Sequence, residues 1–421
     1  MKLIIVFYLF TLSISALSQG LTENDNRIIY EIDSINSSDT SFNELLFFDT
    51  ILNIPNVVFI GEQTHGEGDE TIAKTRLIEY LIKKQGFNIL VFESPFYDTY
   101  LGGVFVKSTK QPKVYLKTAI PPIWFSTKEF TAMKEYLISG IRTNELKIFG
   151  IDVFMGTLGR NTFIGYLEKN LINSDYTLDS TSKELLKKYI WLYDKNAKRY
   201  FTNDADSINT FYALSELLKQ TKNIKSIPKG FWHQSIKNLI VQLNLNINSF
   251  YHKPYYVIDN IRDKQMADNL LWILRNKRSE DKIIVWSASM HNARNINLIE
   301  KTDDSIFYSR YKPMGGIVHD SIGNQMYSIA FTSGGGYYKT PFIMKDSVEI
   351  ISEQKHSIES VFKNKKIEYG FINLKDSDTT GYFWTSLYSQ PHGHNNVKAV
   401  WPLIHDGIFY IQTIHTPHII K

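Results

Sequence analysis

The chain has 421 residues, of which 43% are hydrophobic, 14% aromatic and 21% charged. This profile is that of a folded globular protein, and it excludes a disordered or fibrous one. The length predicts two to three structural units, or a single α/β enzyme that carries an inserted subdomain. Lys and Arg number 47 against 43 for Asp and Glu, with no long basic block, so nucleic acid is not an expected partner.

The first twenty residues have the pattern of a secretory signal peptide. Lys2 is followed by an apolar run over residues 3–12 and by a small-residue site at Ala16-Leu17-Ser18. The run is too short for a membrane span, and no other segment approaches the roughly 18 consecutive apolar residues that a span needs. We therefore expect a signal peptide over residues 1–18, a periplasmic or secreted mature protein, and no stable membrane insertion.

The chain contains no cysteine. Disulfides, Cys-ligated metals, thiol catalysis and a lipid anchor on Cys are therefore excluded, and stability must come from the core.

Short apolar runs alternate with helical patterns from residue 54 onward, which predicts an α/β fold with a mainly parallel sheet flanked by helices. The expected strands are 57–60, 89–92, 148–151 and 283–286, followed by 327–331, 371–374 and 408–411. Between the first two strands, residues 76–82 have apolar positions at helical spacing, and Gly86 is expected to end that helix. Strand, helix and strand together make one crossover unit.

Residues 158–276 contain no convincing strand but several amphipathic helical patterns in succession. A capping box at Thr181-Ser182-Lys183-Glu184 predicts the start of one helix. The faces of three further helices are expected at Ile208, Phe211, Tyr212 and Ser215, along residues 232–247, and along residues 258–275. We interpret this segment as a helical insertion that covers one side of an α/β core made of residues 19–157 and 277–421.

Polar side chains stand just past the carboxyl ends of the first four apolar runs. Glu62 and His65 follow the first run, Glu93 the second, Asp152 the third and His291 the fourth. In an open α/β sheet the ligand crevice lies outside the carboxyl ends of the strands, so these residues can converge there. Two histidines with carboxylates in one crevice are enough for general acid–base chemistry.

Each of these residues also has a purely structural interpretation. Glu62 could cap the following helix, Asp152 could accept hydrogen bonds from loop amides, and Arg76 could be a solvated helix residue. Glu93 would be costly to bury unless it is paired with Arg76 or with a histidine. His65 favours function, because a loop at a strand end has no core to fill.

Three further motifs carry less weight. Ser287 and Ser289 suggest a serine nucleophile, but the chain has no Gly-x-Ser-x-Gly. Gly334-Gly335-Gly336 lacks the helix and the lysine of a phosphate-binding loop, which favours a turn. His392-Gly393-His394 is expected to be a surface loop with weak metal affinity at best.

The order of the motifs resembles the erythromycin esterase family. Its opening signature is matched by Gly61-Glu62-x-Thr64-His65-Gly66, Arg76-Leu77-Ile78-Glu79, Gly86-Phe87 and Phe92-Glu93. Later matches are Trp124 to Glu129, Phe149-Gly150-Ile151-Asp152, Arg262-Asp263-x-x-Met266 with Asn269 and Trp272, Trp286 to His291, and Met314-Gly315. The resemblance spans residues 53–412 and implies an α/β core with a helical insertion.

The resemblance implies hydrolysis of an ester by a histidine that activates water, without a metal or another cofactor. In the best-known members of the family the ester is the macrolactone of erythromycin. On this sequence the base would be His65, with Glu62 and Glu93 orienting the base or the water. His291 would be the second imidazole of the cleft.

The remaining roles that the resemblance implies concern anion and substrate contacts. Arg76 and Lys74 would hold a carboxylate or the developing oxyanion. Trp124, Asp152 and Met314 would contact the substrate, an ester or lactone of low molecular mass.

The chain departs from the family pattern after the fourth strand. The family pattern is usually Trp-Ala-His-Asn-x-His, whereas this chain has Trp286-Ser287-Ala288-Ser289-Met290-His291. Ala288 therefore replaces the first of two histidines.

Two other functions stay open besides the exported ester hydrolase. The first is an exported small-molecule binding protein that has lost turnover, which Ala288 favours. The second is a metal-dependent hydrolase that uses His65, His291 and Glu93, because two histidines and a carboxylate form a known catalytic zinc set.

Overall fold

The computed structural model describes residues 20–420 except 40, 172–177, 193–203, 223, 225, 227, 301–304 and 352–353. The predicted signal peptide, residues 1–18, lies outside the described residues. Within them, every helix is too short or too polar to cross a membrane.

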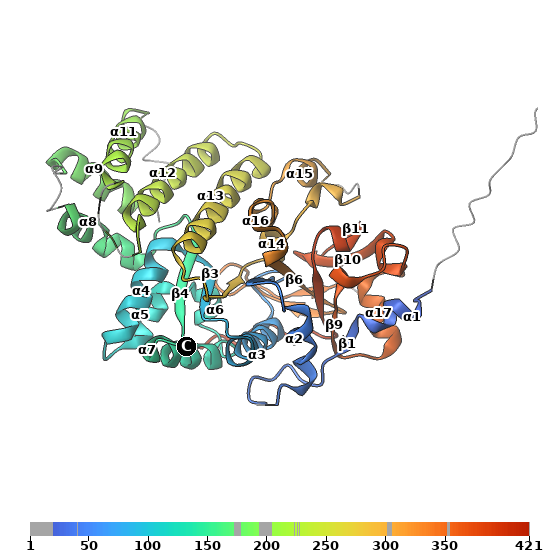
Figure 1. Ribbon diagram of the computed structural model, residues 1–421. Coiled ribbons are helices and arrows are strands. Elements are labelled where there is room, and N and C mark those ends of the chain that lie inside the picture. Colours follow the sequence, from blue (N-terminus) through green and yellow to red (C-terminus); the bar gives the residue numbers. More distant parts are fainter. Residues whose placement is uncertain are drawn as a thin grey trace, which may run out of the picture.

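An eight-stranded sheet in the order β1-β9-β12-β6-β2-β5-β3-β4 forms the centre of the molecule (Figure 1). The strands are β1 (Ile29–Glu31), β2 (Val57–Ile60), β3 (Ile89–Pro95), β4 (Lys147–Asp152), β5 (Ile283–Trp286), β6 (Met326–Ser333), β9 (Tyr369–Ile372) and β12 (Gly407–Ile411). Neighbouring strands from β12 to β4 are parallel, whereas β9 is antiparallel to both β12 and β1. The predicted mainly parallel sheet is confirmed, and β1 is an edge strand that the patterns did not indicate.

The central strands are apolar on both faces because helices cover both. In β2, Val58 and Ile60 pack into one core, and Val57 and Phe59 pack into the other. The first core includes α2 (Phe47–Ile51), α3 (Gly68–Gln85), α4 (Phe96–Ser108), α5 (Pro112–Ala119) and α7 (Thr131–Thr143). Helix α3 ends as predicted at Gly86, whose φ of 72° suits glycine.

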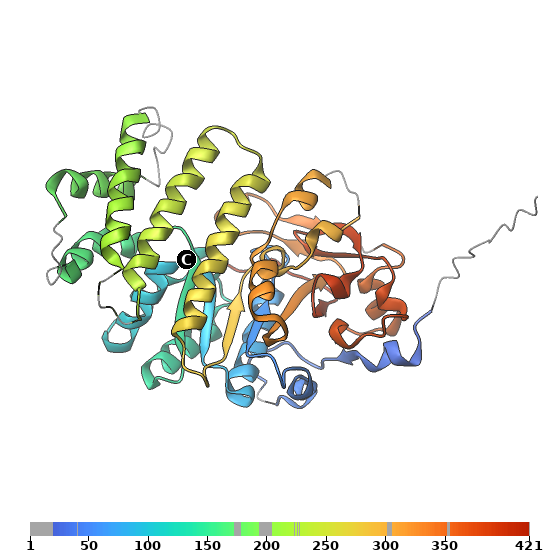
Figure 2. The ribbon, with the colours of Figure 1, turned by 45° about the horizontal axis from the view of Figure 1, so that its top comes forward.

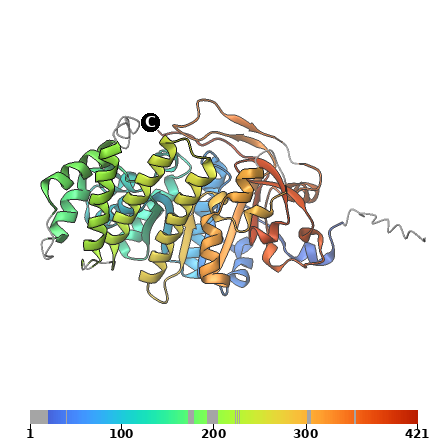
Figure 3. The ribbon, with the colours of Figure 1, turned by 90° about the horizontal axis from the view of Figure 1, so that it is seen from above.

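The second core holds the helices between β4 and β5, and the described residues of that segment contain no strand. These helices are α8 (Thr157–Leu171), α9 (Ser180–Leu192), α11 (Asp204–Thr221), α12 (Phe231–Phe250) and α13 (Tyr255–Asn276). Figures 2 and 3 show them side by side, coloured green to yellow, at the left of the molecule. The α/β fold with a helical subdomain is therefore as predicted.

Two local predictions in the helical segment are wrong. The helix α9 begins at Ser180, because the carboxylate of Asp179, and not Thr181, accepts a hydrogen bond from the N–H of Ser182 at 2.9 Å. In α11, Ile208, Phe211 and Tyr212 are 52%, 48% and 67% exposed. The buried stripe of that helix is formed instead by Thr210, Leu214 and Leu217, which are spaced four and three residues apart.

Two small hairpins lie outside the main sheet. β7 (Gly336–Tyr338) pairs with β8 (Val348–Ile350), and β10 (Leu387–His392) pairs with β11 (Asn395–Ala399). The triple-glycine motif joins β6 to β7 as a turn, in agreement with the prediction. Gly336, the first residue of β7 after this turn, has a φ of 113°, which favours glycine over other residues.

Candidate active site

The sheet order explains why the predicted polar residues meet. β2, β5, β3 and β4 are neighbours, and their carboxyl ends form one edge. Glu62 follows β2, Glu93 lies near the end of β3, and Asp152 is the last residue of β4. His291 lies in α14 (Ser289–Asn292), directly after β5.

His65 is held by Glu62 in the loop between β2 and α3. Nδ1 of His65 lies 2.6 Å from Oε1 of Glu62, and the second oxygen of Glu62 accepts from Nζ of Lys74 at 2.7 Å and from the indole N–H of Trp286 at 2.9 Å. The edge of the Trp124 ring contacts the imidazole, with ring centroids 5.5 Å apart. The carboxylate thus fixes the orientation of the His65 ring, and it favours a proton on Nδ1.

The charges around this pair oppose the cost of burial. Burial alone raises the pKa of Glu62, but Lys74 and His65 outweigh burial and lower it. Burial alone lowers the pKa of His65, but its hydrogen bond to Glu62 and the charges of Glu62, Glu93 and Glu67 raise it above 6.5. The His65 side chain is 28% exposed, whereas that of Glu62 is 4% exposed. His65 is therefore the part of this pair that solvent can reach.

Arg262 of α13 neutralises the carboxylates at the ends of β3 and β4. Its Nε and Nη2 donate to the two oxygens of Asp152 at 3.0 and 2.6 Å, and Nη2 also donates to Oε1 of Glu93 at 2.7 Å. The second oxygen of Glu93 accepts from the main-chain N–H of Ala288 at 3.0 Å. This planar, two-pronged contact is one that arginine can make and lysine cannot.

His291 lies beside Arg262 with carboxylates at both ring nitrogens. Its Nδ1 is 2.9 Å from Oδ1 of Asp263 and 3.0 Å from the hydroxyl of Tyr311, and Nε2 is 3.4 Å from Oε1 of Glu93. Burial alone lowers the pKa of His291, but Asp263 and Glu93 outweigh burial and raise it to about 10. These carboxylates favour the charged ring, which makes His291 a weaker acceptor of a proton from water than a free histidine.

Arg262 also approaches the His291 ring directly. Nη1 of Arg262 lies 3.1 Å from Nε2 of His291, which could be a hydrogen bond only if Nε2 carried no proton. With the ring charged, both cations face the Glu93 carboxylate. Burial raises the pKa of Glu93, but His291 and Arg262 outweigh burial and lower it well below its usual value.

Of the two partners predicted for Glu93, the histidine is confirmed, because Nε2 of His291 lies 3.4 Å from Oε1 of Glu93, and Arg76 is wrong. Arg76 is 2% exposed and donates to the carbonyls of Asn36, Asp39 and Ser41, and it also pairs with the carboxylate of Glu44. The Arg76 guanidinium therefore holds the segment before β2 against α3. The position beside Glu93 that was predicted for Arg76 is occupied by Arg262.

All four predicted substrate contacts are buried in this structure: Trp124 and Asp152 are 2% and 5% exposed, and Lys74 and Met314 are fully buried. Met314 begins α16 (Met314–Ile322), its side chain is fully buried in the second core, and only its main-chain N–H reaches the site, donating to Asp263 at 2.8 Å. Lys74 is also fully buried and is paired with Glu62. A contact between the Met314 side chain and a substrate would need movement of the core, because that side chain packs among apolar residues.

Arg262, Asp263 and Tyr311 are the site residues that the pattern of strand ends did not assign. Arg262 and Asp263 lie inside a long helix, where a charged pair has the ordinary appearance of a solvated face. The only available signal was their position in the motif Arg262-Asp263-x-x-Met266. Tyr311 follows α15 (Ser305–Arg310) and had no signal.

The geometry weighs against the metal-dependent alternative. Within the part of the chain that the structure describes, no three His, Asp or Glu side chains are placed to hold a metal ion. Nδ1 of His65 is engaged by Glu62, and both nitrogens of His291 face other protein groups. The serine-nucleophile interpretation also stays unsupported, because Ser287 and Ser289 are fully buried.

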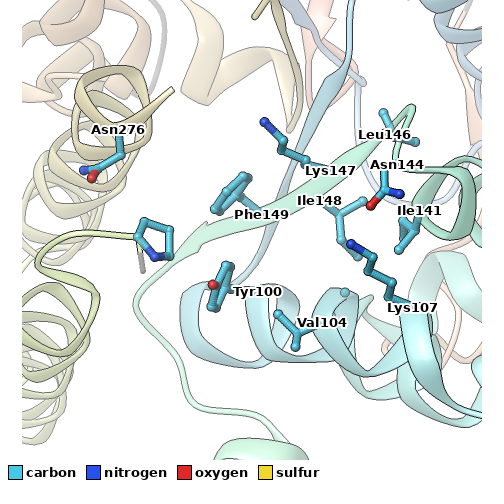
Figure 4. Close-up of a pocket in the computed structure, with 12 residues that line it drawn as sticks. Tyr100, Val104, Lys107, Ile141, Asn144, Leu146, Lys147, Ile148, Phe149 and Asn276 are labelled. Carbon is cyan, nitrogen blue, oxygen red and sulfur yellow. The ribbon is translucent and has the colours of Figure 1, made fainter. Parts of the chain in front are cut away.

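A cavity of about 480 Å³ lies at the other end of β4 (Figure 4). Its lining includes the apolar side chains of Tyr100, Ile148 and Phe149 and the two cations Lys107 and Lys147. None of the predicted site residues lines this cavity, so it is separate from the polar residues at the carboxyl ends of the strands.

The comparison with known proteins decides the family. Residues 82–414 match the family model described as erythromycin esterase. The chain belongs to the erythromycin esterase family. Hydrolase activity is therefore supported for this chain by its family, and also by a relative from Bacillus subtilis (strain 168), which bears the name Putative hydrolase YbfO. That relative is 24% identical over 457 residues, which cover all of this chain and 98% of the relative.

Two further members of the family are similar in part of the sequence or in fold. Erythromycin esterase type II of Escherichia coli is 39% identical over 79 residues, which are 18% of this chain and 17% of that protein. The structure of a mutant of erythromycin esterase EreC in its open conformation superposes with a TM-score of 0.73 at 14% identity, covering 93% of this chain and 99% of that one. The second likeness shows a common fold.

Proposed function

We propose that this protein is an exported hydrolase that cleaves an ester or lactone with a water molecule activated by His65, without a metal ion. One observation carries the proposal. Glu62 holds Nδ1 of His65 at 2.6 Å, and among the described residues no hydrogen-bond partner faces Nε2 of this partly exposed ring. Nε2 is therefore free to take a proton from water, as a general base must be.

The cations beside Glu93 supply the second requirement of ester hydrolysis. The carbonyl oxygen of an ester gains negative charge as water attacks, and fixed positive groups stabilise that charge. The side chains of Arg262 and His291 are 19% and 12% exposed, so both have atoms that solvent can reach. We assign oxyanion stabilisation to them in place of Arg76, and Glu62 with Lys74 and Trp286 orients the base.

The substrate is an ester or lactone of low molecular mass, with macrolides as the first class to test. Ala288 presents only a main-chain N–H to Glu93, so the family's additional imidazole is missing on this side of the crevice. The same observation favours the second candidate, a binding protein that has lost turnover.

One screen separates the candidates. Purified protein is incubated with erythromycin, simple lactones and p-nitrophenyl esters, with and without EDTA, while thermal shifts report binding. The proposal expects turnover in the presence of EDTA. Turnover that EDTA abolishes would support the metal-dependent hydrolase, and a thermal shift without turnover would support the binding protein. Export is tested by the N-terminus of the mature protein, which is expected near Gln19.

The pH dependence of turnover provides a prediction from the charges around His65. Only the neutral ring accepts a proton, and its pKa is raised above 6.5. We expect kcat/KM to rise with pH and to level off, with an apparent pKa above that of a free histidine. Glu62→Gln removes both the ionic hydrogen bond and the negative charge, so the rising limb should move to lower pH while kcat falls.

The profile is measured from about pH 5 to 9 for both proteins, a range that brackets histidine titration. Glu23→Gln serves as a control, because Glu23 is 83% exposed and forms a surface ion pair with Arg27. A Glu62→Gln profile that coincides with that of the wild type would exclude Glu62 as the partner that sets the pKa of His65.

A further inference from the structure

The hairpin β10–β11 is fixed to the loop that carries His65. The N–H of Gly393, at the tip of the hairpin, donates to the carbonyl of Gln63 at 2.9 Å. The side-chain amide of Gln63 donates back to the carbonyl of Gln390 at 2.7 Å. In Figure 1 the hairpin lies beside β6, far along the chain from the loop that it contacts.

Glu67 holds the main chain on both sides of His65. Its Oε1 accepts from the N–H of Thr64 at 3.2 Å and from the hydroxyl of Thr64 at 2.5 Å, and its Oε2 accepts from the N–H of Gly66 at 3.0 Å. The Glu67 side chain is 1% exposed. A buried carboxylate of this kind needs strong hydrogen-bond donors. Its position then determines where the residues that are bonded to it lie.

The motif His392-Gly393-His394 is not the surface loop predicted from the sequence. His392 is fully buried, and the His394 side chain is 6% exposed. Nε2 of His394 lies 2.7 Å from Oε1 of Glu67, and its ring packs on Tyr338 with centroids 4.4 Å apart. Nδ1 of His394 is buried and has no hydrogen-bond partner among the described residues. A neutral ring therefore carries its proton on Nε2, toward Glu67.

The loop has little freedom beyond these contacts. The carbonyl of Gly66 accepts from the N–H of Lys339 at 3.0 Å, and a Cβ atom on Gly66 would lie 2.5 Å from the main-chain carbon of Lys339. The hairpin β10–β11, the Glu67 carboxylate and Lys339 thus hold residues 63–66, while the His65 ring contacts Glu62. A displacement of about 1 Å at a reacting group can cost about 100-fold in rate.

We propose that Glu67 and His394 form a positioning pair that holds the His65 loop in the conformation in which Nε2 faces the crevice. This inference rests on the proposed role of His65 as a base. The pair does not touch the reacting atoms. His394 donates to the carboxylate, and the carboxylate fixes the amides of Thr64 and Gly66.

The first test is turnover of His394→Leu, His394→Gln and the control His392→Leu. Leucine fills the space without a donor, so kcat should fall by about 10- to 100-fold with KM nearly unchanged. Glutamine places an N–H donor where Nε2 of histidine stands and should restore kcat close to the wild type. His392 lies in the same hairpin but contacts His405, so His392→Leu should lower stability without this loss of kcat.

The second test needs no substrate. Diethyl pyrocarbonate modifies the neutral imidazole, and mass spectrometry of the His65 peptide follows the rate of modification against pH. The charges of Glu62, Glu93 and Glu67 raise the pKa of His65. Glu67→Gln removes one of these charges and one acceptor of the loop, so the midpoint of the rate profile should move to lower pH. His394→Leu should raise the rate of modification across the range, because the loop is no longer held.

The outcomes separate this inference from the proposed function. Wild-type kcat and wild-type His65 modification in His394→Leu would overturn the positioning pair, as would an equal loss of kcat in His392→Leu. A fully active His65→Ala would refute the proposed base, and the modification rates would still decide whether the pair holds the loop. If His394→Leu does not fold, Glu67→Gln and His394→Gln decide by the same readouts.

Discussion

Replacing His65 with alanine is expected to lower kcat for the ester substrate by about 10²- to 10⁴-fold, the usual contribution of a general base. The protein should stay folded, because the side chain lies on a loop and is 28% exposed. Glu62 would keep two partners after the substitution, Nζ of Lys74 and the indole N–H of Trp286. The measurement is kcat at a pH where the wild-type ring is neutral, together with the urea unfolding curve.

His418→Ala is the matched control for that substitution. Nδ1 of His418 lies 2.7 Å from a carboxylate oxygen of Glu129, close to the 2.6 Å between His65 and Glu62, but the His418 side chain is 76% exposed. Its removal should leave kcat unchanged. If the two variants had the same kcat, the His–Glu contact at residue 65 would have no special chemical role.

Replacing Arg262 with methionine should have the largest effect on stability. Arg262 neutralises Glu93 and Asp152, whose side chains are 4% and 7% exposed. Removing one partner of a buried ion pair leaves the other charge without compensation and costs about 3–5 kcal/mol. We expect the free energy of unfolding to fall by about that amount, and turnover to be lost because the oxyanion site is lost with it.

Arg262→Lys and Arg27→Met are the comparisons for this prediction. Lysine keeps the charge but cannot make the two-pronged contact with Asp152, so its stability should lie between those of the wild type and the methionine variant. Arg27 is 68% exposed in a surface pair with Glu23, and its removal should change stability little. Equal unfolding curves for Arg262→Met and Arg27→Met would show that Arg262 does not compensate the buried carboxylates.

The part of the site that follows strand ends could be predicted from the sequence. Apolar runs fix where each parallel strand stops, and the sheet then brings Glu62, Glu93 and Asp152 to one edge. Arg262 could not be found in this way, because it reaches the same edge from the middle of α13, 169 residues after Glu93. The spacing of residues in the sequence does not show that two groups so far apart along the chain lie in contact.

The error at Arg76 has a simple geometric origin. Residues two apart on a helix point to different faces, so Lys74 and Arg76 of α3 cannot both face the crevice. Lys74 takes that face and pairs with Glu62, and Arg76 points to the segment 36–44. Both residues are cations close to the strand end in sequence, so both were predicted to face the site. Only their different directions around the helix axis distinguish them.

The burial of His394 also depended on contacts distant in sequence. A glycine between two histidines correctly indicates a turn, and Gly393 has a φ of 66°. The turn is covered because Gln63 and Glu67, more than 300 residues earlier, bind to it. In α11, by contrast, apolar Ile208 and Tyr212 remain exposed although their spacing is helical.

The most direct test of the central claim is the turnover of His65→Ala with and without added imidazole. If His65 acts only as a base, a small base entering the vacated space should restore turnover in proportion to its concentration. Substituted imidazoles should restore it more strongly as their basicity rises. The account predicts almost no turnover without imidazole and a rate that rises as imidazole is added. Wild-type turnover by His65→Ala in the absence of any added base would contradict it.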